Sequence, residues 1–219
     1  PWWFVNNFSR LGDRTTFAAS MFNTTLILAG LCVIVISYFS VSELVTTYRQ
    51  RELWHRRRFD RPGRDMPWFR VRMAILSVLL AACGCCFIGI GSFRQTPHPI
   101  AHNAFAFSLP GITAVLLLAL PWLAPLFSKA MYVVSELIVV VGTVAVVVWR
   151  YDITSMTNLE LLLGMLFFGW FIVFCRQIAA LEADRIQEQV VHLQLAAEGA
   201  DAVDEPLESR VASDRWQST

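Results

Sequence analysis

The chain has 219 residues, of which 56% are hydrophobic and 16% are charged, and its formal net charge is +1. An ordinary soluble domain has about 45–50% apolar and about 25% charged residues, so this composition is not that of a typical soluble protein. A net charge so close to zero gives no general attraction to nucleic acid, which we do not expect as a partner. The basic residues are nearly all arginines, a bias that hints at a GC-rich genome such as that of an actinobacterium.

The apolar residues gather in five blocks, each about as long as the twenty residues that cross a hydrocarbon core. The blocks run from Met21 to Val45, Met73 to Phe93, Phe105 to Phe127, Met131 to Val148 and Leu159 to Phe174. They are continuous and lack the two-residue alternation of barrel strands, so they predict helices. The expected fold class is therefore all-α, a polytopic transmembrane helix bundle.

The arginines predict the orientation of this bundle. The segment from Tyr48 to Arg72 holds nine arginines and three acidic residues, and Lys129 and Arg176 fall on the same side of the membrane. The positive-inside rule makes this side the cytoplasm. We expect a multi-pass protein of the plasma membrane with a cytoplasmic C-terminus. The N-terminal segment then lies outside, and Pro1-Trp-Trp-Phe4 is typical of an aromatic belt closing an earlier helix, so we expect six spans in the full protein.

The fifth span continues beyond the membrane. Residues 1–178 form the predicted bundle, and residues 179–198 form an amphipathic cytoplasmic helix of good helix formers. Its apolar residues Ile186, Val190, Leu193 and Ala197 are four, three and four apart. This spacing predicts a narrow seam on one helix face, which we expect to dock on a partner. Gly199 should end the helix, and residues 199–219 are expected to be an acidic, disordered tail.

The sequence carries no established catalytic motif, and we expect no catalytic residue, cofactor or metal. The phosphate-binding glycine loop, the zinc-binding His-Glu-x-x-His and the nucleophile motif Gly-x-Ser-x-Gly are all absent from it. The five cysteines fall inside apolar blocks. They are expected to be buried thiols, and Cys83-Gly-Cys-Cys86 as a redox site is the weaker alternative because a thiolate is disfavoured in lipid.

One carboxylate falls well inside a span. Glu136 lies about one and a half turns into the fourth apolar block. Ionisable groups inside a membrane often handle ions or protons. The simpler alternative is a protonated or hydrogen-bonded structural glutamate near Lys129.

A second polar group gathers on the predicted outer face. Arg94, His98 and His102 belong to one outer segment, and Asp13 to another. Arginine and histidine just above a membrane can bind the phosphate of a lipid head group. The alternative is that these residues only pair the outer loops with one another. His98 and His102 are four apart, but Pro99 between them argues against a two-histidine metal site.

Several short motifs are similar to a known family. They are Asn7-Phe-Ser-Arg-Leu-Gly-Asp13, the run from Met21 to Gly30, Gly89-Ile-Gly-Ser-Phe-Arg94 and the run from His102 to Phe107. Over about residues 5–178 the chain resembles the bacterial six-span family of unknown function related to the DRAM/FRAG/Sfk membrane proteins. Its matching positions are Ser9, Leu11, Gly12, Asn23 and His102. The resemblance implies a preceding first span and a setting in membrane lipid organisation, since eukaryotic relatives are associated with it.

Two functions follow as hypotheses. The first is a non-enzymatic membrane protein that binds lipid, or an accessory subunit of a larger cell-envelope complex for lipid transport or assembly. Its partners would be membrane lipids and other membrane protein subunits. The second is a lipid-modifying enzyme or carrier whose head-group site is made by Arg94, His98, His102 and Asp13.

The predicted orientation can be tested by labelling. A cysteine introduced at position 62 should be protected from an impermeant thiol reagent in intact cells, and one at position 97 should react. The parent chain gives the background from the five native cysteines. Labelling at position 62 with protection at position 97 would reverse the orientation.

Overall fold

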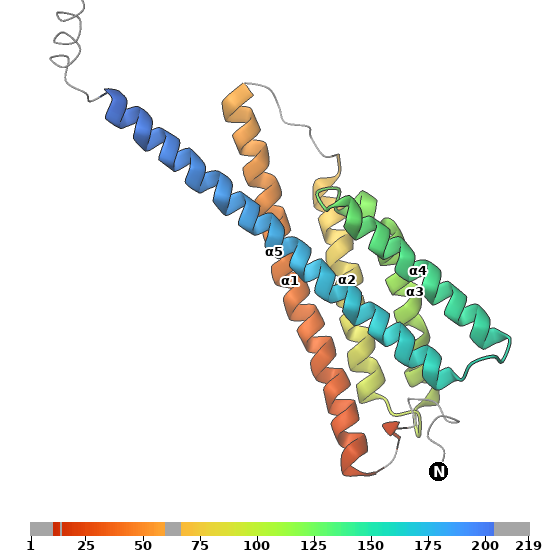
Figure 1. Ribbon diagram of the computed structural model, residues 1–219. Helices are drawn as coiled ribbons and strands as arrows, with labels where there is room; N and C mark the ends of the chain where they lie inside the picture. Colours follow the sequence, from red (N-terminus) through yellow and green to blue (C-terminus); the bar gives the residue numbers. More distant parts are fainter. Residues whose placement is uncertain (1–10, 14, 60–66, 204–219) are drawn as a thin grey trace, which may run out of the picture. The chain divides into compact units, whose positions relative to one another are not determined.

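The structure, a computed structural model, describes residues 11–13, 15–59 and 67–203, and all five of the long elements in these ranges are α-helices (Figure 1). They are α1 (Phe17–Phe59), α2 (Phe69–Ser92), α3 (Pro99–Leu123), α4 (Lys129–Arg150) and α5 (Met156–Val203). Each is long and apolar enough to cross a membrane. The predicted all-α transmembrane bundle with five spans in this chain is thereby confirmed. The predicted aromatic belt at residues 1–4 and most of the acidic tail lie outside the described residues.

Two helices run further than the sequence predicted. We expected a loop from Tyr48, but α1 continues to Phe59. The reason is that arginine, glutamine, glutamate and leucine are good helix formers and no glycine or proline intervenes before Pro62. We also expected Gly199 to end the last helix, but α5 continues to Val203. A glycine inside a helix costs only about 1 kcal/mol relative to alanine, too little to stop a well-nucleated helix.

The third span is shifted toward the N-terminus. It begins at Pro99 rather than Phe105. Proline is favoured at the first position of a helix, because the backbone N–H that it lacks would have no partner within the helix there. Pro110 and Pro121 lie inside α3, whereas Pro125, expected within the span, follows its end. His98 is the N-cap residue, so Pro99 does not separate it from the helix that carries His102.

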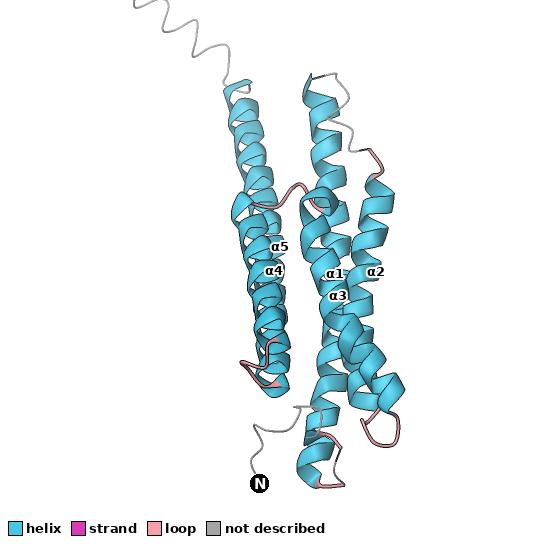
Figure 2. Cartoon of the chain, turned by 90° about the vertical axis from the view of Figure 1, so that its right-hand side faces the viewer, coloured by secondary structure: helices cyan, strands magenta, loops and turns pink. Residues whose placement is uncertain are grey.

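The chain divides into two compact units, residues 1–179 and 180–219, and α5 runs continuously through the division. The first unit is the bundle. The connections 93–98 and 151–155 lie at one end of it, here named the His102 end, and the connection 124–128 lies at the other, here named the Lys129 end (Figure 1). Within this unit, α4 and the bundle part of α5 lie beside the group formed by α1, α2 and α3 (Figure 2).

The helices α1 and α2 pack backbone against backbone. A Cβ atom added at Gly30 would lie 2.5 Å from the carbonyl oxygen of Gly84, and one added at Gly84 would lie 2.8 Å from that of Gly30. A Cβ atom added at a third glycine, Gly91, would lie 2.7 Å from the Asn23 carbonyl oxygen. Small residues permit such approach in membranes, where dispersion contacts, and not the hydrophobic effect, hold helices together.

The pair α2 and α3 is held at both ends. Near the His102 end, the ring of Phe105 packs directly on Gly89, and it stacks on Phe93 with 5.8 Å between ring centroids. At the Lys129 end, Arg72 donates a 3.0 Å hydrogen bond to the Trp122 carbonyl oxygen and lies 4.7 Å from the centre of its ring. A cation at the C-terminal end of α3 also suits the partial negative charge of that helix end.

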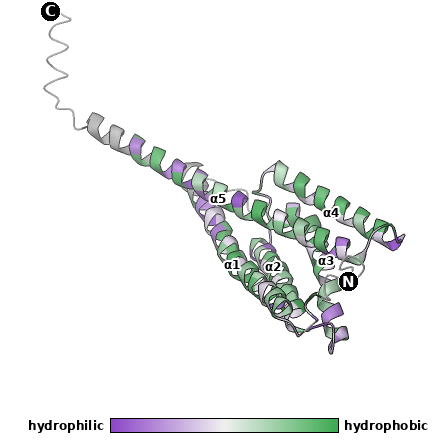
Figure 3. Cartoon of the chain, turned by 60° about the horizontal axis from the view of Figure 1, so that its bottom comes forward, coloured by the Kyte–Doolittle hydropathy of each residue, from purple (hydrophilic) through white to green (hydrophobic). Residues whose placement is uncertain are grey.

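The surface of the bundle is apolar over most of its length. In Figure 3 the spans are mainly hydrophobic, and hydrophilic residues gather toward helix ends and along the continuation of α1. Large side chains on α4 such as Leu137, Val140 and Val144 are more than half exposed. In water such a surface would aggregate, whereas in a bilayer it faces lipid, which agrees with a transmembrane bundle.

The glycine contact between α1 and α2 predicts the effect of one substitution. Gly84→Leu should force the two helices apart and lower stability by about 1–3 kcal/mol, the usual cost of overpacking. Thermal unfolding in mild detergent measures this as a fall of several degrees in the midpoint. Gly111→Leu is the matched control, because a Cβ atom there meets nothing within 4 Å. Equal midpoints for the two variants would contradict the tight contact.

Candidate functional site

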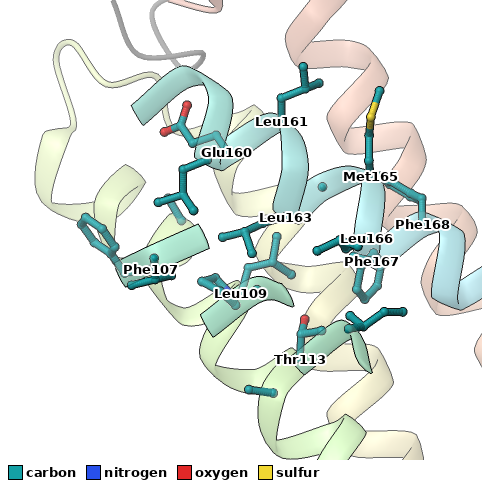
Figure 4. A pocket seen from close by; sticks show the side chains of 18 of the residues that line it. Phe107, Leu109, Thr113, Glu160, Leu161, Leu163, Met165, Leu166, Phe167 and Phe168 are labelled. Carbon is teal, nitrogen blue, oxygen red and sulfur yellow. The ribbon is translucent and has the colours of Figure 1, made fainter. Parts of the chain in front are cut away.

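A cavity of about 780 Å³ lies within the bundle between α3, α4 and α5, with small contributions from α1 and α2 (Figure 4). Its lining is almost wholly apolar. The residues contributed by α3 include Ala106, Phe107, Pro110 and Leu117; those of α4 include Ile138, Gly142, Val146 and Trp149; those of α5 include Met156, Leu163, Gly164 and Phe167. Ligand pockets in proteins generally measure about 300–1,000 Å³ and are mostly apolar, so the size is that of a binding site.

The cavity occupies the half of the bundle nearest the His102 end. On α4 its lining extends from Ile138 to Trp149, next to the connection 151–155. At 1.5 Å per residue this is a length of about 16 Å, roughly half of the 30 Å hydrocarbon core of a bilayer. The cavity therefore has the depth of a single leaflet.

The cavity reaches the surface of the bundle. Its lining residues Phe107 and Met165 are 61% and 65% exposed. They belong to α3 and α5, so the opening lies along the sides of the helices and not only at their ends. In a membrane, such an opening faces lipid chains.

The other half of the bundle is closed by contacts between α4 and α5. The indole Nε1 of Trp170 donates a 3.0 Å hydrogen bond to Ser135 Oγ, and both residues are fully buried. Ser128 Oγ donates to Gln177 Oε1 at 2.7 Å, close to the Lys129 end. The rings of Phe127 and Phe174 meet edge to face, with 5.7 Å between their centroids. These contacts give the cavity its floor.

Most polar groups in the lining are satisfied within the protein. Thr143 Oγ1 donates a 2.7 Å hydrogen bond to the Val139 carbonyl oxygen of its own helix, and Thr113 Oγ1 lies 3.8 Å from the sulfur of Cys83. Such bonds hide a hydroxyl from lipid. Glu160, on α5, is the one ionisable side chain among the lining residues, which all belong to the described part of the chain. Figure 4 shows its carboxyl group at the edge of the cavity near Phe107.

The predicted outer-face cluster is divided by the structure. Asp13 Oδ1 accepts a 2.7 Å hydrogen bond from the Thr96 backbone N–H, which ties the segment before α1 to the connection between α2 and α3. His102 is 3% exposed, and its Nδ1 lies 2.7 Å from the Phe93 carbonyl oxygen. Because a carbonyl oxygen only accepts, Nδ1 is the donor. His102 Nε2 is buried and has no partner among the residues whose side chains are described.

Arg94 and His98 are exposed at the same end, and the ring of His98 lies 6.1 Å from that of Phe93. None of Asp13, Arg94, His98 and His102 lines the cavity. Within the described ranges, no three metal-binding side chains of histidine, cysteine, aspartate or glutamate gather in one place. The four residues thus surround the loops at the His102 end, with two of them bonded to loop backbone.

No family model, curated protein or solved structure matches this chain. The resemblance to the six-span family therefore stays a prediction. Two positions that carry it are partners in the structure, since Asn23 Nδ2 donates a 2.9 Å hydrogen bond to the Gly12 carbonyl oxygen. A third, His102, bonds Phe93 in the connection that Asp13 also holds. These hydrogen bonds fasten this end of the bundle, which is a physical reason for these residue types at these positions.

The remaining predicted site residues lie on the surface. Glu136 is exposed on α4, next to the buried Ser135, and forms no ion pair with Lys129. On the second unit, Ile186, Val190 and Leu193 are 48%, 47% and 72% exposed. These three seam residues are therefore exposed on the surface of the second unit.

Sequence reasoning did not find the cavity. In the sequence, its walls are ordinary apolar spans, and Glu160 falls at the start of the fifth apolar block. Gly142 and Gly164 were the available signal, because small residues on facing helices leave space where larger residues would meet. The spacing of residues within one helix does not show which residues face these glycines across the bundle. The two glycines therefore could not be interpreted without the fold.

The structure predicts that His102 stabilises the bundle. His102→Ala should remove the bond to Phe93, leave its carbonyl oxygen without a partner and cost about 1–3 kcal/mol. The expected result is lower yield and a lower midpoint of thermal unfolding in detergent. His98→Ala, an exposed histidine four residues away, should change neither. A His102→Ala protein as stable as its parent would show that the buried histidine serves some other purpose.

Proposed function

We propose that this chain is a non-enzymatic, lipid-binding integral membrane protein that takes an acyl chain into the cavity between α3, α4 and α5. The observation that carries the proposal is the cavity itself, at about 780 Å³ with an almost wholly apolar lining. An apolar cavity of this kind excludes water and binds apolar molecules. Lipid chains are the apolar molecules that surround it at the highest concentration.

The shape of the cavity supports a lipid over a smaller solute. Its length of about 16 Å matches one leaflet, and its exposed lining residues Phe107 and Met165 border the lipid. A chain can therefore enter sideways without leaving the hydrocarbon. With the orientation expected from the arginines, the His102 end faces outward and the bound lipid comes from the outer leaflet.

The head-group enzyme is the less favoured function. Asp13 and His102 each hold loop backbone at the His102 end, Asp13 through Oδ1 and His102 through Nδ1. Arg94 and His98 are exposed and remain available to a head group. These placements support binding and loop fastening more than a reaction.

We also propose that the chain acts as a subunit of a larger cell-envelope complex. The exposed seam of Ile186, Val190 and Leu193 supports this, because burying each such side chain contributes about 1.5–3 kcal/mol. A protein that holds one lipid chain and extends a helix toward a partner suits an accessory subunit of lipid transport or assembly.

A cavity-filling substitution tests the lipid site. Gly164 lines the cavity, and a Cβ atom there meets nothing within 4 Å, so Gly164→Phe should fill the space without strain. Displacing even two buried methylene groups costs about 1.6 kcal/mol, which corresponds to more than a tenfold loss of affinity. Native mass spectrometry after purification in mild detergent measures the retained lipid.

The matched control is Gly169→Phe on the same helix. Gly169 is exposed, its added Cβ also meets nothing within 4 Å, and it does not line the cavity. We expect this variant to retain lipid as the parent chain does, with both variants equally stable to heat. Equal retention in the Gly164→Phe and Gly169→Phe proteins would exclude the cavity as the lipid site.

A further inference from the structure

The seam of Ile186, Val190 and Leu193 on the second unit follows the heptad repeat of a coiled coil. In a heptad written a to g, Val190 takes position a, and Ile186 and Leu193 take position d. A β-branched residue at a with leucine at d favours two parallel helices. The residue types of the seam are therefore typical of a two-stranded coiled coil.

The seam is a different face of α5 from the one that is buried. Among the described side chains, Leu181 is the last buried one along this helix, and it takes position f. Arg185, which is partly buried and lies 3.9 Å from the Glu182 carboxylate, takes position c. Positions c and f lie on the side of a helix away from a and d. The seam is thus available to another helix while the buried face stays covered.

The positions beside the seam accept an identical helix. In a parallel coiled coil, position g of one helix faces position e of the following heptad in the other helix. Two copies would therefore bring Glu182 to Gln187, and Gln189 to Gln194. Like charges between facing helix positions are destabilising, and neither of these pairs contains two charges. The other charged residues of the segment 182–191 lie at the outer positions b, c and f: Asp184, Arg185 and Glu188.

The continuity of α5 with a span determines how two copies would meet. This helix runs from Met156 to Val203 without a break, and part of it is long and apolar enough to cross a membrane. Two copies inserted with the same topology therefore hold α5 parallel and at the same level. Each seam residue then lies level with its counterpart, as a twofold axis along the helices requires. Because the span already nucleates the helix, a short seam does not have to stabilise helix formation as well.

We propose that α5 forms a parallel, in-register coiled coil with α5 of a second copy of this chain, through Ile186, Val190 and Leu193. The inference rests on the part of the proposed function in which this seam docks on another subunit, and it identifies that subunit as an identical chain. The dimer then carries two lipid cavities, one in each copy.

Cysteine cross-linking in isolated membranes tests the pairing. Val190→Cys and Leu193→Cys place a thiol at positions a and d, where two copies meet. The matched controls are Val191→Cys and Leu195→Cys at positions b and f, since the native residues are apolar and similarly exposed, 47% against 45% and 72% against 58%. Mild oxidation should give several times more covalent dimer at 190 and 193 than at 191 and 195. The parent chain gives the background from its five native cysteines. Equal cross-linking at 190 and 191 would overturn the proposal.

A charge exchange beside the seam tests the orientation and register. Gln189→Glu with Gln194→Glu places like charges at facing g and e positions, whereas Gln189→Lys with Gln194→Glu places opposite charges there. Sedimentation in mild neutral detergent at low salt measures the dimer fraction. We expect a severalfold lower fraction in the first variant and a fraction at least equal to that of the parent chain in the second. Salt should reduce the difference, because it screens exposed charges. Equal dimer fractions in the two variants would show that these positions do not face each other.

Serine substitutions separate failure of this inference from failure of the proposed function. Val190→Ser with Leu193→Ser should lower self-association about tenfold or more, because two apolar side chains lose their burial. Val191→Ser with Leu195→Ser should not, and both variants should retain lipid and unfold at the same temperature as the parent chain. A monomeric parent chain that loses a different co-purifying subunit on Val190→Ser with Leu193→Ser would refute the identical partner and keep the accessory-subunit role. A monomeric parent chain with no such subunit would remove both, and the lipid site would stand on its own test.

Discussion

The hydrogen bond between Trp170 and Ser135 is the contact on which the shape of this bundle depends. Ser135 Oγ accepts from the indole and donates to the Met131 carbonyl oxygen, so a fully buried hydroxyl has both a donor and an acceptor as partners. Without water, each unmet polar group would cost several kcal/mol. The bond therefore fixes the position at which α4 and α5 meet. This position lies in the half of the bundle away from the His102 end.

Two kinds of helix contact in the bundle have opposite effects on the space between helices. Gly30 and Gly84 bring the backbones of α1 and α2 into contact, which leaves no space between them. In contrast, α5 meets its neighbours through large rings: Phe167 lies 5.2 Å from Phe87 between ring centroids, and Phe174 lies 5.7 Å from Phe127. Large side chains hold helix axes apart. The cavity is lined by some of these rings together with the small residues Gly142 and Gly164.

The sequence predicted the spans well because a membrane imposes one rule on every residue of a helix that crosses it. Apolar blocks of about twenty residues leave few alternatives. The helix ends were predicted less well, because the membrane does not determine where α1 stops after Val45 or whether Gly199 breaks α5. Those outcomes depend on helix propensities of about 1 kcal/mol or less per residue.

The cavity lies beyond sequence reasoning for a different reason. Its volume depends on the separation of α3, α4 and α5, and residues on different helices, such as Trp170 and Ser135, contribute to this separation. Glu160 illustrates the limit. Its position near the end of a span was evident from the sequence, but its place in an apolar wall was not. His102 shows the opposite case. Its residue type suggested a head-group site, whereas in the structure it is buried and bonds the Phe93 carbonyl oxygen.

The two walls of the cavity are held by contacts in different halves of the bundle. The α3 wall is fixed beside the cavity mouth, where His102 bonds Phe93 and Phe105 packs on Gly89. The α4 and α5 wall is fixed through Trp170 with Ser135 and Ser128 with Gln177, all in the opposite half of the bundle. Met156 and Glu160, which line the cavity, come directly after the connection 151–155, so the α5 part of the lining begins at the His102 end.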